Sequence, residues 1–199
     1  MEIMVKTYPA PSVDYGEIMR YAGIGKGAVE LEAMVRDCVA EAENRFSYKV
    51  CYVTLPVTIS GNRVDFESFS VESAHLAKCL AGCEKAVIFA ATVGMEIDRI
   101  IKKYSVLSPA KAVIFQAIGA ERCESLCDVF NKEIAQNTAT APRFSPGYGD
   151  FPLDSQRDIF TLLDAGRKIG VTLGESLLMS PSKSVTAVIG IKGGKQDEH

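Results

Sequence analysis

The longest regular pattern in the chain is one helix that begins at Ser108-Pro109 and continues to about Asn137. Serine is a preferred residue just before a helix, and proline is preferred in the first turn, where its missing N–H leaves no bond unmade. At 1.5 Å per residue such a helix would be roughly 40 Å long. A chain of 199 residues is long enough for one sizeable core, so we expect this helix to be the backbone of a single domain.

The segments with strand-like patterns predict a mostly antiparallel sheet. Residues 48–59 alternate in polarity and are rich in β-branched side chains, and after the turn at Ser60-Gly61-Asn62 residues 64–66 return as a hairpin partner. The continuous apolar run 85–91 is typical of a central strand that is buried on both faces. The last two predicted strands are 173–179 and 185–191.

Helical patterns fill the stretches between these strands. The shorter predicted helices cover residues 13–22, 28–45, 72–80, 96–104 and 155–164. Helices that pack on an antiparallel sheet define the α+β class. The chain shows no internal repeat and no linker that would divide it, so we predict one α+β domain over residues 1–191 and a polar tail at 192–199.

Composition and charge argue against several classes of partner. The net charge is −3 at pH 7, with acidic and basic residues interspersed, so no basic patch indicates a nucleic-acid ligand. No apolar run approaches the roughly 20 residues that a bilayer span requires, and residues 1–6 lack the layout of a signal peptide. We therefore expect a cytoplasmic protein that binds neither nucleic acid nor membrane.

Six cysteines occur in the chain, mostly within apolar helical patterns, which favours free buried thiols over disulfides. His75, Cys79 and Cys83 are spaced i, i+4 and i+8, so on one predicted helix they would share a face. That face is either a zinc site or a stripe of core residues. Structural zinc sites almost always use four ligands, and the sequence shows no fourth, so we predict packing and no metal site.

The segment from Arg143 to Pro152, Arg-Phe-Ser-Pro-Gly-Tyr-Gly-Asp-Phe-Pro, carries the clearest sign of a ligand site. Its prolines restrict the backbone, while Gly147 and Gly149 let it turn and approach a ligand closely. Arg143 offers a planar pair of donors that suits a carboxylate or a phosphate. The segment is therefore either a cradle for a small anionic group or a connector with a solvent-exposed arginine.

Acidic side chains form a second group of candidates. Glu121, Glu124 and Asp128 are spaced i, i+3 and i+7 on the long helix, so they share one face, which is either a solvated surface or part of a site. Asp14 lies near the start of the first predicted helix, where an aspartate caps exposed N–H groups. With two histidines in the chain a hydrolytic triad is poorly supplied, and we predict no catalytic acid, base or nucleophile.

Several short motifs follow one another in a recognisable order. They are Phe89-Ala-Ala-Thr-Val-Gly-Met-Glu-Ile-Asp98, Arg143-Phe-Ser-Pro-Gly-Tyr148, Leu162-Leu-Asp164, Leu173-Gly-Glu-Ser-Leu-Leu-Met-Ser-Pro181 and Ser184-Val185. Together they resemble the reactivation (activation) domain of vitamin B12 (cobalamin)-dependent methionine synthase. The resemblance covers the second half of the chain well and residues 1–84 loosely. Because the chain ends at His199, before a Tyr-Tyr segment of that family, we expect a stand-alone short form of the domain.

The resemblance implies a binding site for S-adenosylmethionine. In the family a glutamate of the long helix contacts this ligand, and the alignment puts Glu124 there. Arg143 would pair with the ligand carboxylate, and the turn after it would offer backbone groups and an aromatic ring. Asp14 corresponds to a ligand-contacting aspartate of the family, beside its possible place as a helix cap. The implied binding residues are Asp14, Glu124, Arg143, Ser145, Gly147 and Tyr148.

The resemblance also implies what the bound ligand is for. The protein would dock on a cobalamin-binding partner, a methionine synthase subunit or another corrinoid protein, whose cobalt has decayed to the cob(II) state. A flavodoxin-like or other low-potential electron donor would reduce the cobalt, and cob(I) would take the methyl group from S-adenosylmethionine. Because cob(I) is itself a strong nucleophile, the protein would need only to hold the methyl group in line with the cobalt.

The sequence leaves two alternatives open. Glu175, Ser176 and Met179 would either face the cobalamin or brace the turn, and a predicted strand that buries Leu173 and Leu177 favours the structural role. The protein as a whole would be either an activation subunit of a methionine synthase system or a non-catalytic interaction or sensor module for a corrinoid protein that has lost ligand binding.

Overall fold

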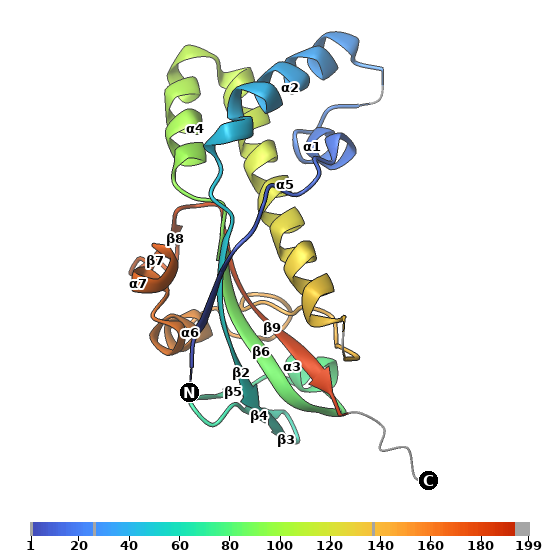
Figure 1. Ribbon diagram of the computed structural model, residues 1–199, viewed down its shortest axis with the longest axis vertical. Helices are drawn as coiled ribbons and strands as arrows, with labels where there is room; N and C mark the ends of the chain where they lie inside the picture. The colour runs from blue at the N-terminus through green and yellow to red at the C-terminus, as the bar shows by residue number, and fades with distance from the viewer. Residues whose placement is uncertain (1, 26, 137, 194–199) are drawn as a thin grey trace.

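The computed structural model describes residues 2–25, 27–136 and 138–193, and its centre is a four-stranded sheet (Figure 1). The strand order is β1-β2-β6-β9, and every neighbouring pair is antiparallel. The predicted strands at 85–91 and 185–191 are confirmed as β6 and β9. The bounds are β1 (Met4–Thr7), β2 (Lys49–Pro56), β6 (Cys83–Thr92) and β9 (Ser184–Lys192).

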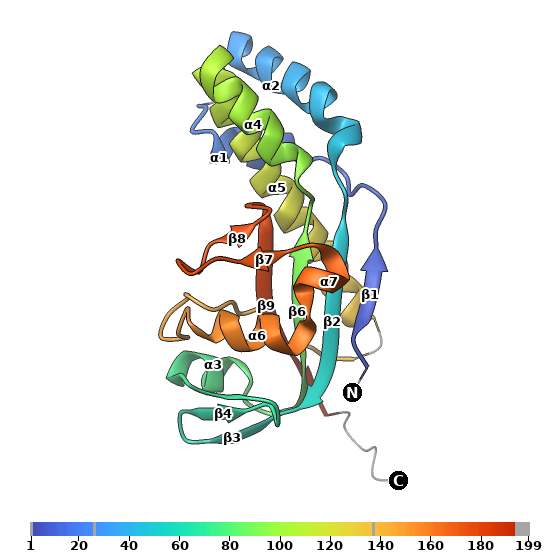
Figure 2. The ribbon, with the colours of Figure 1, turned by 90° about the vertical axis from the view of Figure 1, so that its left-hand side faces the viewer.

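Helices cover both faces of this sheet. Figures 1 and 2 show α5 along one face and α6 with α7 on the other, while α1, α2 and α4 gather around the upper part of α5. The predicted α+β class is confirmed. The helices are α1 (Tyr15–Tyr21), α2 (Val29–Ala42), α3 (Ala74–Cys79), α4 (Glu96–Leu107), α5 (Pro109–Ile134), α6 (Ser155–Leu163) and α7 (Ala165–Ile169), with a 3-10 turn, η1 (Glu43–Arg45), after α2.

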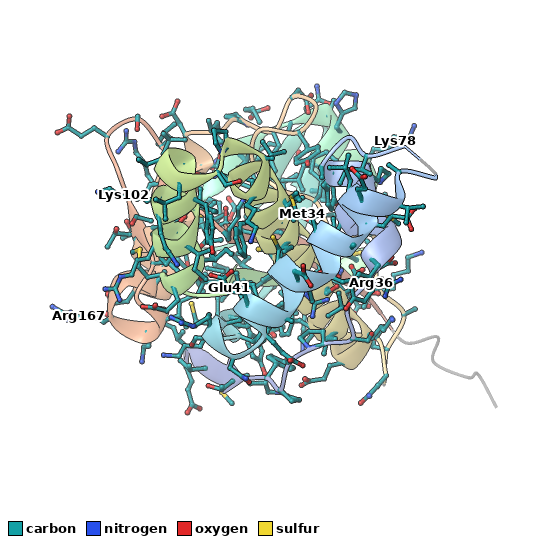
Figure 3. All side chains as sticks on the ribbon, turned by 90° about the horizontal axis from the view of Figure 1, so that it is seen from above. Met34, Arg36, Glu41, Lys78, Lys102 and Arg167 are labelled. Carbon is teal, nitrogen blue, oxygen red and sulfur yellow. The ribbon has the colours of Figure 1, made fainter. Side chains whose placement is uncertain are left out.

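The long predicted helix is confirmed as α5, with Pro109 in its first turn. Ser108 occupies the cap position without a side-chain hydrogen bond. The predicted end at about Asn137 falls on a residue outside the described ranges, and α5 itself ends at Ile134. Near the amino-terminal end of α5, α2 lies beside α4 and α5 (Figure 3). Met34 of α2 packs against the core, and the Arg36 guanidinium lies over the Tyr15 ring of α1, 5.1 Å from its centroid.

The sheet separates two hydrophobic cores, and β6 contributes to both. Val87 and Phe89 pack in the core under α5, whereas Ile88 and Ala90 pack in the core under α6 and α7. All four side chains are essentially inaccessible to solvent. The prediction of a strand buried on both faces is therefore correct, and it follows from side chains that alternate between two helical layers.

Two small sheets complete the fold. The predicted hairpin at Ser60-Gly61-Asn62 is confirmed, since β3 (Thr58–Ser60) pairs with β4 (Arg63–Asp65), and β5 (Ser70–Glu72) adds a third strand. The predicted strand at 173–179 is wrong. That stretch turns back on itself between β7 (Thr172–Leu173) and β8 (Met179–Ser180).

The turn inside 173–179 has a local cause. Leu177 has a φ of 62°, in the left-handed region, and the Gly174 N–H donates to the Leu178 carbonyl at 2.9 Å. The chain therefore reverses instead of running through a sheet. Leu173, Leu177 and Met179 are half-buried as a result, while Glu175 and Ser176 are exposed in the turn.

The proposed stripe of His75, Cys79 and Cys83 does not exist, because α3 ends at Cys79 and Cys83 begins β6. His75 is exposed, and the two cysteines are half-buried. Across residues 2–25, 27–136 and 138–193, no three His, Cys, Asp or Glu side chains are grouped to hold a metal ion.

The described chain ends just beyond the sheet. Apart from Lys192, the last residue of β9, and Gly193, the predicted polar tail lies outside the described residues. Among the helices of the described ranges, none has the length and apolar character that crossing a bilayer requires.

Candidate functional site

A cavity of about 500 Å³ lies at the outer edge of β9, where the two helical layers meet. Glu124 reaches it from α5, Gln156 from α6, and Val185 and Thr186 from β9. The volume is within the range of roughly 300–1,000 Å³ that is usual for pockets that hold small molecules. The segment after Arg143 forms the remaining wall.

That segment begins as an extra piece of strand beside β9. The Phe144 N–H donates to the Val188 carbonyl at 2.9 Å, and the Val188 N–H donates to the Phe144 carbonyl at 2.8 Å. Phe144 therefore ties the start of the turn to the sheet, and its ring stacks on Phe151 at 6.2 Å between centroids.

Pairing with β9 stops two residues later. The register at Phe144 and Val188 would place Pro146 opposite Thr186, and a proline has no N–H to continue the ladder. The chain turns away instead, through Gly147 with a φ of 91°, and the Gly147 N–H donates to the Phe151 carbonyl at 2.8 Å. The edge of β9 at Thr186 is left facing the cavity.

The far end of the turn is held by Asp150. Its carboxylate accepts hydrogen bonds from the Ser73 hydroxyl, from the Ala74 N–H at 2.8 Å and from the His75 N–H at 3.1 Å, at the start of α3. The Ser73 bond and the two backbone bonds hold the pKa of this carboxyl below its ordinary value. This contact was not predictable from local sequence patterns, because the two partners lie more than seventy residues apart.

We expect Asp150→Ala to lower the thermal midpoint at pH 7. The difference in midpoint between the variant and the wild type should disappear at acidic pH. The folded-state pKa of Asp150 lies below the unfolded value of about 3.9. Its contribution is therefore complete above about pH 5 and disappears as the pH falls through the folded value. Circular dichroism melts from pH 7 to pH 3 test this, with exposed Asp37→Ala as control. A difference between Asp150→Ala and wild type that stays constant over this range would contradict the assignment.

The charged part of the cavity contains Arg143 and Glu124. Arg143 Nη2 donates to Glu124 Oε2 at 2.5 Å, and Nη1 lies 3.9 Å from Asp128 Oδ1, too far for a hydrogen bond. Nη1 is buried and has no hydrogen-bond partner within the described part of the chain. Burial lowers the pKa of this guanidinium, but its neighbours Cys127 and Glu124 raise it by more, so Arg143 stays charged. Half of its donor fork is occupied, and the other half is free for an anionic group.

The acidic face of α5 is divided rather than uniformly solvated. Glu121 is 2% exposed and forms a buried pair with Arg122, in which Nε to Oε2 and Nη2 to Oε1 are both 2.6 Å. Arg122 also donates to the carbonyls of Pro11 and Ser12 at 2.7 and 2.6 Å. The interpretation of this face as a solvated surface is therefore wrong for Glu121, whose pair fastens the amino-terminal segment to α5.

Asp14 follows directly in that segment and caps α1, where its Oδ1 accepts from the Glu17 N–H at 3.0 Å. The predicted cap is confirmed. Asp14 does not line the main cavity. It lines a neighbouring acidic hollow of about 310 Å³, which shares Glu124 with the main cavity. The Asp14 N–H donates to Glu121 Oε1 at 3.1 Å, so the buried pair also sets the position of Asp14.

Of the six candidate binding residues, the structure brings four to one wall. Glu124, Arg143, Ser145 and Tyr148 line the main cavity, and Tyr148 is 69% exposed at its mouth. Gly147 shapes the turn without lining the cavity.

Residues that the sequence did not suggest complete the lining. Gln156 is 5% exposed and Thr186 is 2% exposed, yet Gln156 Oε1 and Thr186 Oγ1 have no hydrogen-bond partner within the described residues. The sequence offered one signal for each residue, a polar side chain at a position expected to face the core. Gln156 shares a helix face with Ile159, and Thr186 stands among apolar residues of a strand. Met179, left open between two roles, adds an apolar surface from β8.

Residues 121–193 match the family model described as vitamin B12 dependent methionine synthase, activation domain. This range is a little more than a third of the chain and contains every residue found to line the main cavity. No curated protein sequence matches the chain.

Among solved structures, the crystal structure of the MetH reactivation domain bound to AdoHcy is similar, with a TM-score of 0.70. The match covers 96% of this chain and 78% of that chain at 14% sequence identity, so it establishes the fold. The resemblance predicted from the sequence is thereby confirmed: the chain has the fold of the methionine synthase reactivation domain, and its residues 121–193 carry the sequence pattern of the vitamin B12-dependent methionine synthase activation domain.

Proposed function

We propose that the chain binds S-adenosylmethionine in the main cavity and supports reductive methylation of cob(II)alamin on a methionine synthase or related corrinoid protein. The observation that carries the proposal is the half-occupied Arg143 fork beside Glu124 in a cavity with apolar walls. The similar reactivation domain has AdoHcy bound, which is the product that remains when S-adenosylmethionine gives up its methyl group.

The chemistry of the lining suits this ligand. S-adenosylmethionine carries a carboxylate, an ammonium, a sulfonium and an adenine. The free Nη1 of Arg143 would donate a charge-assisted hydrogen bond to the ligand carboxylate, while Glu124 offsets a positive group. Apolar surfaces from Phe144, Val185 and Met179 would cover the uncharged parts.

The chain needs no acid or base for the transfer itself. When bound in the partner, cobalamin would supply the nucleophile once a low-potential donor had reduced its cobalt by one electron. The methyl group leaves sulfur with no change in protonation. The residues of this chain hold the sulfonium methyl and exclude competing orientations, which is catalysis by proximity.

An apolar rim beside the cavity supports docking of a partner. The rim comprises Tyr148, Leu153 and Leu178, which are 69%, 43% and 74% exposed. Leu153 packs near Gly147 in the turn, and Leu178 precedes Met179 of the cavity wall. Exposed large apolar side chains near a cavity suit an interaction surface, and we assign docking of the corrinoid protein to these residues.

A second candidate is a sensor or interaction module that no longer binds the ligand. One observation favours it: Arg143 is already paired with Glu124 at 2.5 Å, so part of the charge in the cavity is satisfied from within the chain. Direct measurement of binding separates the two.

Titration calorimetry with S-adenosylmethionine and S-adenosylhomocysteine tests the proposal. We expect both to bind the wild-type protein and Arg143→Ala to weaken binding by about 1.5–3 kcal/mol, the range for hydrogen bonds to charged groups, with little change in thermal midpoint. Arg99→Ala is the matched control, because Arg99 is an exposed arginine paired with Glu96 on α4. No binding to the wild type would favour the sensor module, and unaltered binding in a folded Arg143→Ala variant would remove the arginine from the site.

A further inference from the structure

Two buried polar side chains, one on α6 and one on β9, line the cavity and have no hydrogen-bond partner within the described residues. Gln156 belongs to the first turn of α6, and Thr186 belongs to β9. Buried polar groups in folded proteins are almost always hydrogen-bonded, by protein or by a bound molecule. Gln156 Oε1 and Thr186 Oγ1 are exceptions within the described residues, and the two residues line the same cavity. They therefore mark where the polar atoms of a ligand belong.

The backbone of Thr186 points to the same place. Both backbone groups of Val188 bond to Phe144, outward from β6. Groups of residues i and i+2 lie on the same edge of a strand, so Thr186 also presents its N–H and C=O outward. Pro146 would stand opposite Thr186 in this register and has no N–H to donate. Thr186 thus offers a hydroxyl, a donor and an acceptor at the open edge of β9.

This set of groups suits a flat heteroaromatic ring with a donor next to an acceptor. The side-chain amide of glutamine carries an acceptor and donors in one plane, and it pairs in a bidentate way with the N6 amine and N7 of adenine. Phe144, Val185 and Met179 supply apolar surface on which such a ring would lie. The charged groups of the cavity, Arg143 and Glu124, are then left for the amino-acid portion.

We propose that Gln156 and Thr186 are the specificity-determining residues that recognise the adenine ring of the ligand. This inference rests on the proposed function and adds to it a division of the cavity into an adenine end and an amino-acid end. A purine with an oxygen in place of the N6 amine presents an acceptor to Gln156 Oε1 and is discriminated against.

The test uses Gln156→Leu and Thr186→Val in the full chain, with two probes. S-adenosylhomocysteine carries the N6 amine, and S-inosylhomocysteine carries oxygen at that position. Calorimetry on the wild type should show binding of the first to be at least tenfold tighter. Each variant should bind S-adenosylhomocysteine about tenfold or more weaker, and Gln156→Leu should bind both probes with nearly equal affinity. Gln136→Leu and Thr58→Val, at exposed positions, are the matched controls.

The thermal midpoint of the two variants distinguishes a role in ligand recognition from a purely structural role. Removal of a buried polar group that lacks a partner should leave the thermal midpoint unchanged or raise it by up to about 4 °C in a domain of this size. A loss of midpoint in both variants would mean that the two groups bond within the protein and would overturn the inference. So would retained preference for the adenine probe in a folded Gln156→Leu variant. Failure of the wild type to bind either probe would instead overturn the proposed function, and this inference with it.

Discussion

Arg122→Met is expected to lower the free energy of unfolding by about 3–5 kcal/mol, because it leaves the buried Glu121 carboxylate without its counter-charge. Arg122 is 3% exposed and Glu121 is 2% exposed, and four hydrogen bonds of Arg122 would be lost. Burial lowers the pKa of Arg122, but the hydrogen bond and the charge of Glu121, together with Tyr48, raise it by more, so the wild-type pair is ionic. Urea unfolding followed by circular dichroism measures the change.

The double variant Glu121→Leu with Arg122→Met separates the buried charge from the other losses. Replacement of both members of a buried ion pair by apolar residues is often close to neutral, whereas removal of one member is not. We expect the double variant to recover a large part of the stability, although the carbonyls of Pro11 and Ser12 still lack their donor. A loss below about 1 kcal/mol in the single variant would show that water reaches the pair, contrary to its burial.

Under the proposed function, methylation of cobalt is expected only when three components are present together. A corrinoid protein, a low-potential reductant and S-adenosylmethionine should all be required, because the proposed role of the cavity residues is to hold the ligand while the corrinoid protein supplies the nucleophile. The assay is the absorbance change from cob(II) to methyl-cobalt in a methionine synthase that lacks its own reactivation domain. The chain alone should not consume S-adenosylmethionine.

Variants of the proposed binding residues test whether recovery of cobalt methylation depends on the cavity. Glu124→Gln and Arg143→Ala should abolish the dependence of recovery on this protein, whereas Glu30→Gln, an exposed glutamate in the first turn of α2, should not affect it. If several corrinoid partners show no recovery although S-adenosylmethionine binds, the sensor module becomes the better interpretation. Consumption of S-adenosylmethionine without a corrinoid protein would contradict the positioning mechanism.

Local signals explain why α5 and β6 were predictable. A proline in the first turn and an uninterrupted helical pattern specify α5 without reference to the rest of the chain. The apolar run of β6 predicts a strand that is buried on both faces, and this prediction does not require knowing which helices pack on those faces. The stretch 173–179 has the composition of a strand but a left-handed residue, Leu177, inside it. Composition does not report backbone geometry, and this prediction failed.

The face of α5 shows why the site was predictable only in part. Glu121 and Glu124 have the same residue type and neighbouring positions on one helix face, yet one is buried and the other lines a cavity. Periodicity determines which face a residue shares, but the cover over Glu121 comes from a segment 107 residues away. Gln156 and Thr186 were also not predictable as site residues. Whether a polar side chain lacks a hydrogen-bond partner depends on the residues that surround it in the folded protein.

The turn after Arg143 is fastened at both ends, by the Phe144 backbone to β9 and by Asp150 to the start of α3. The segment between these two anchors thus has little conformational freedom left to lose when a ligand arrives. Its ordering is accomplished during folding, and association then carries a smaller entropic penalty. Under the proposed function the chain would act as a rigid receptor, and its affinity for the ligand would depend on the match of polar groups rather than on closure of a loop.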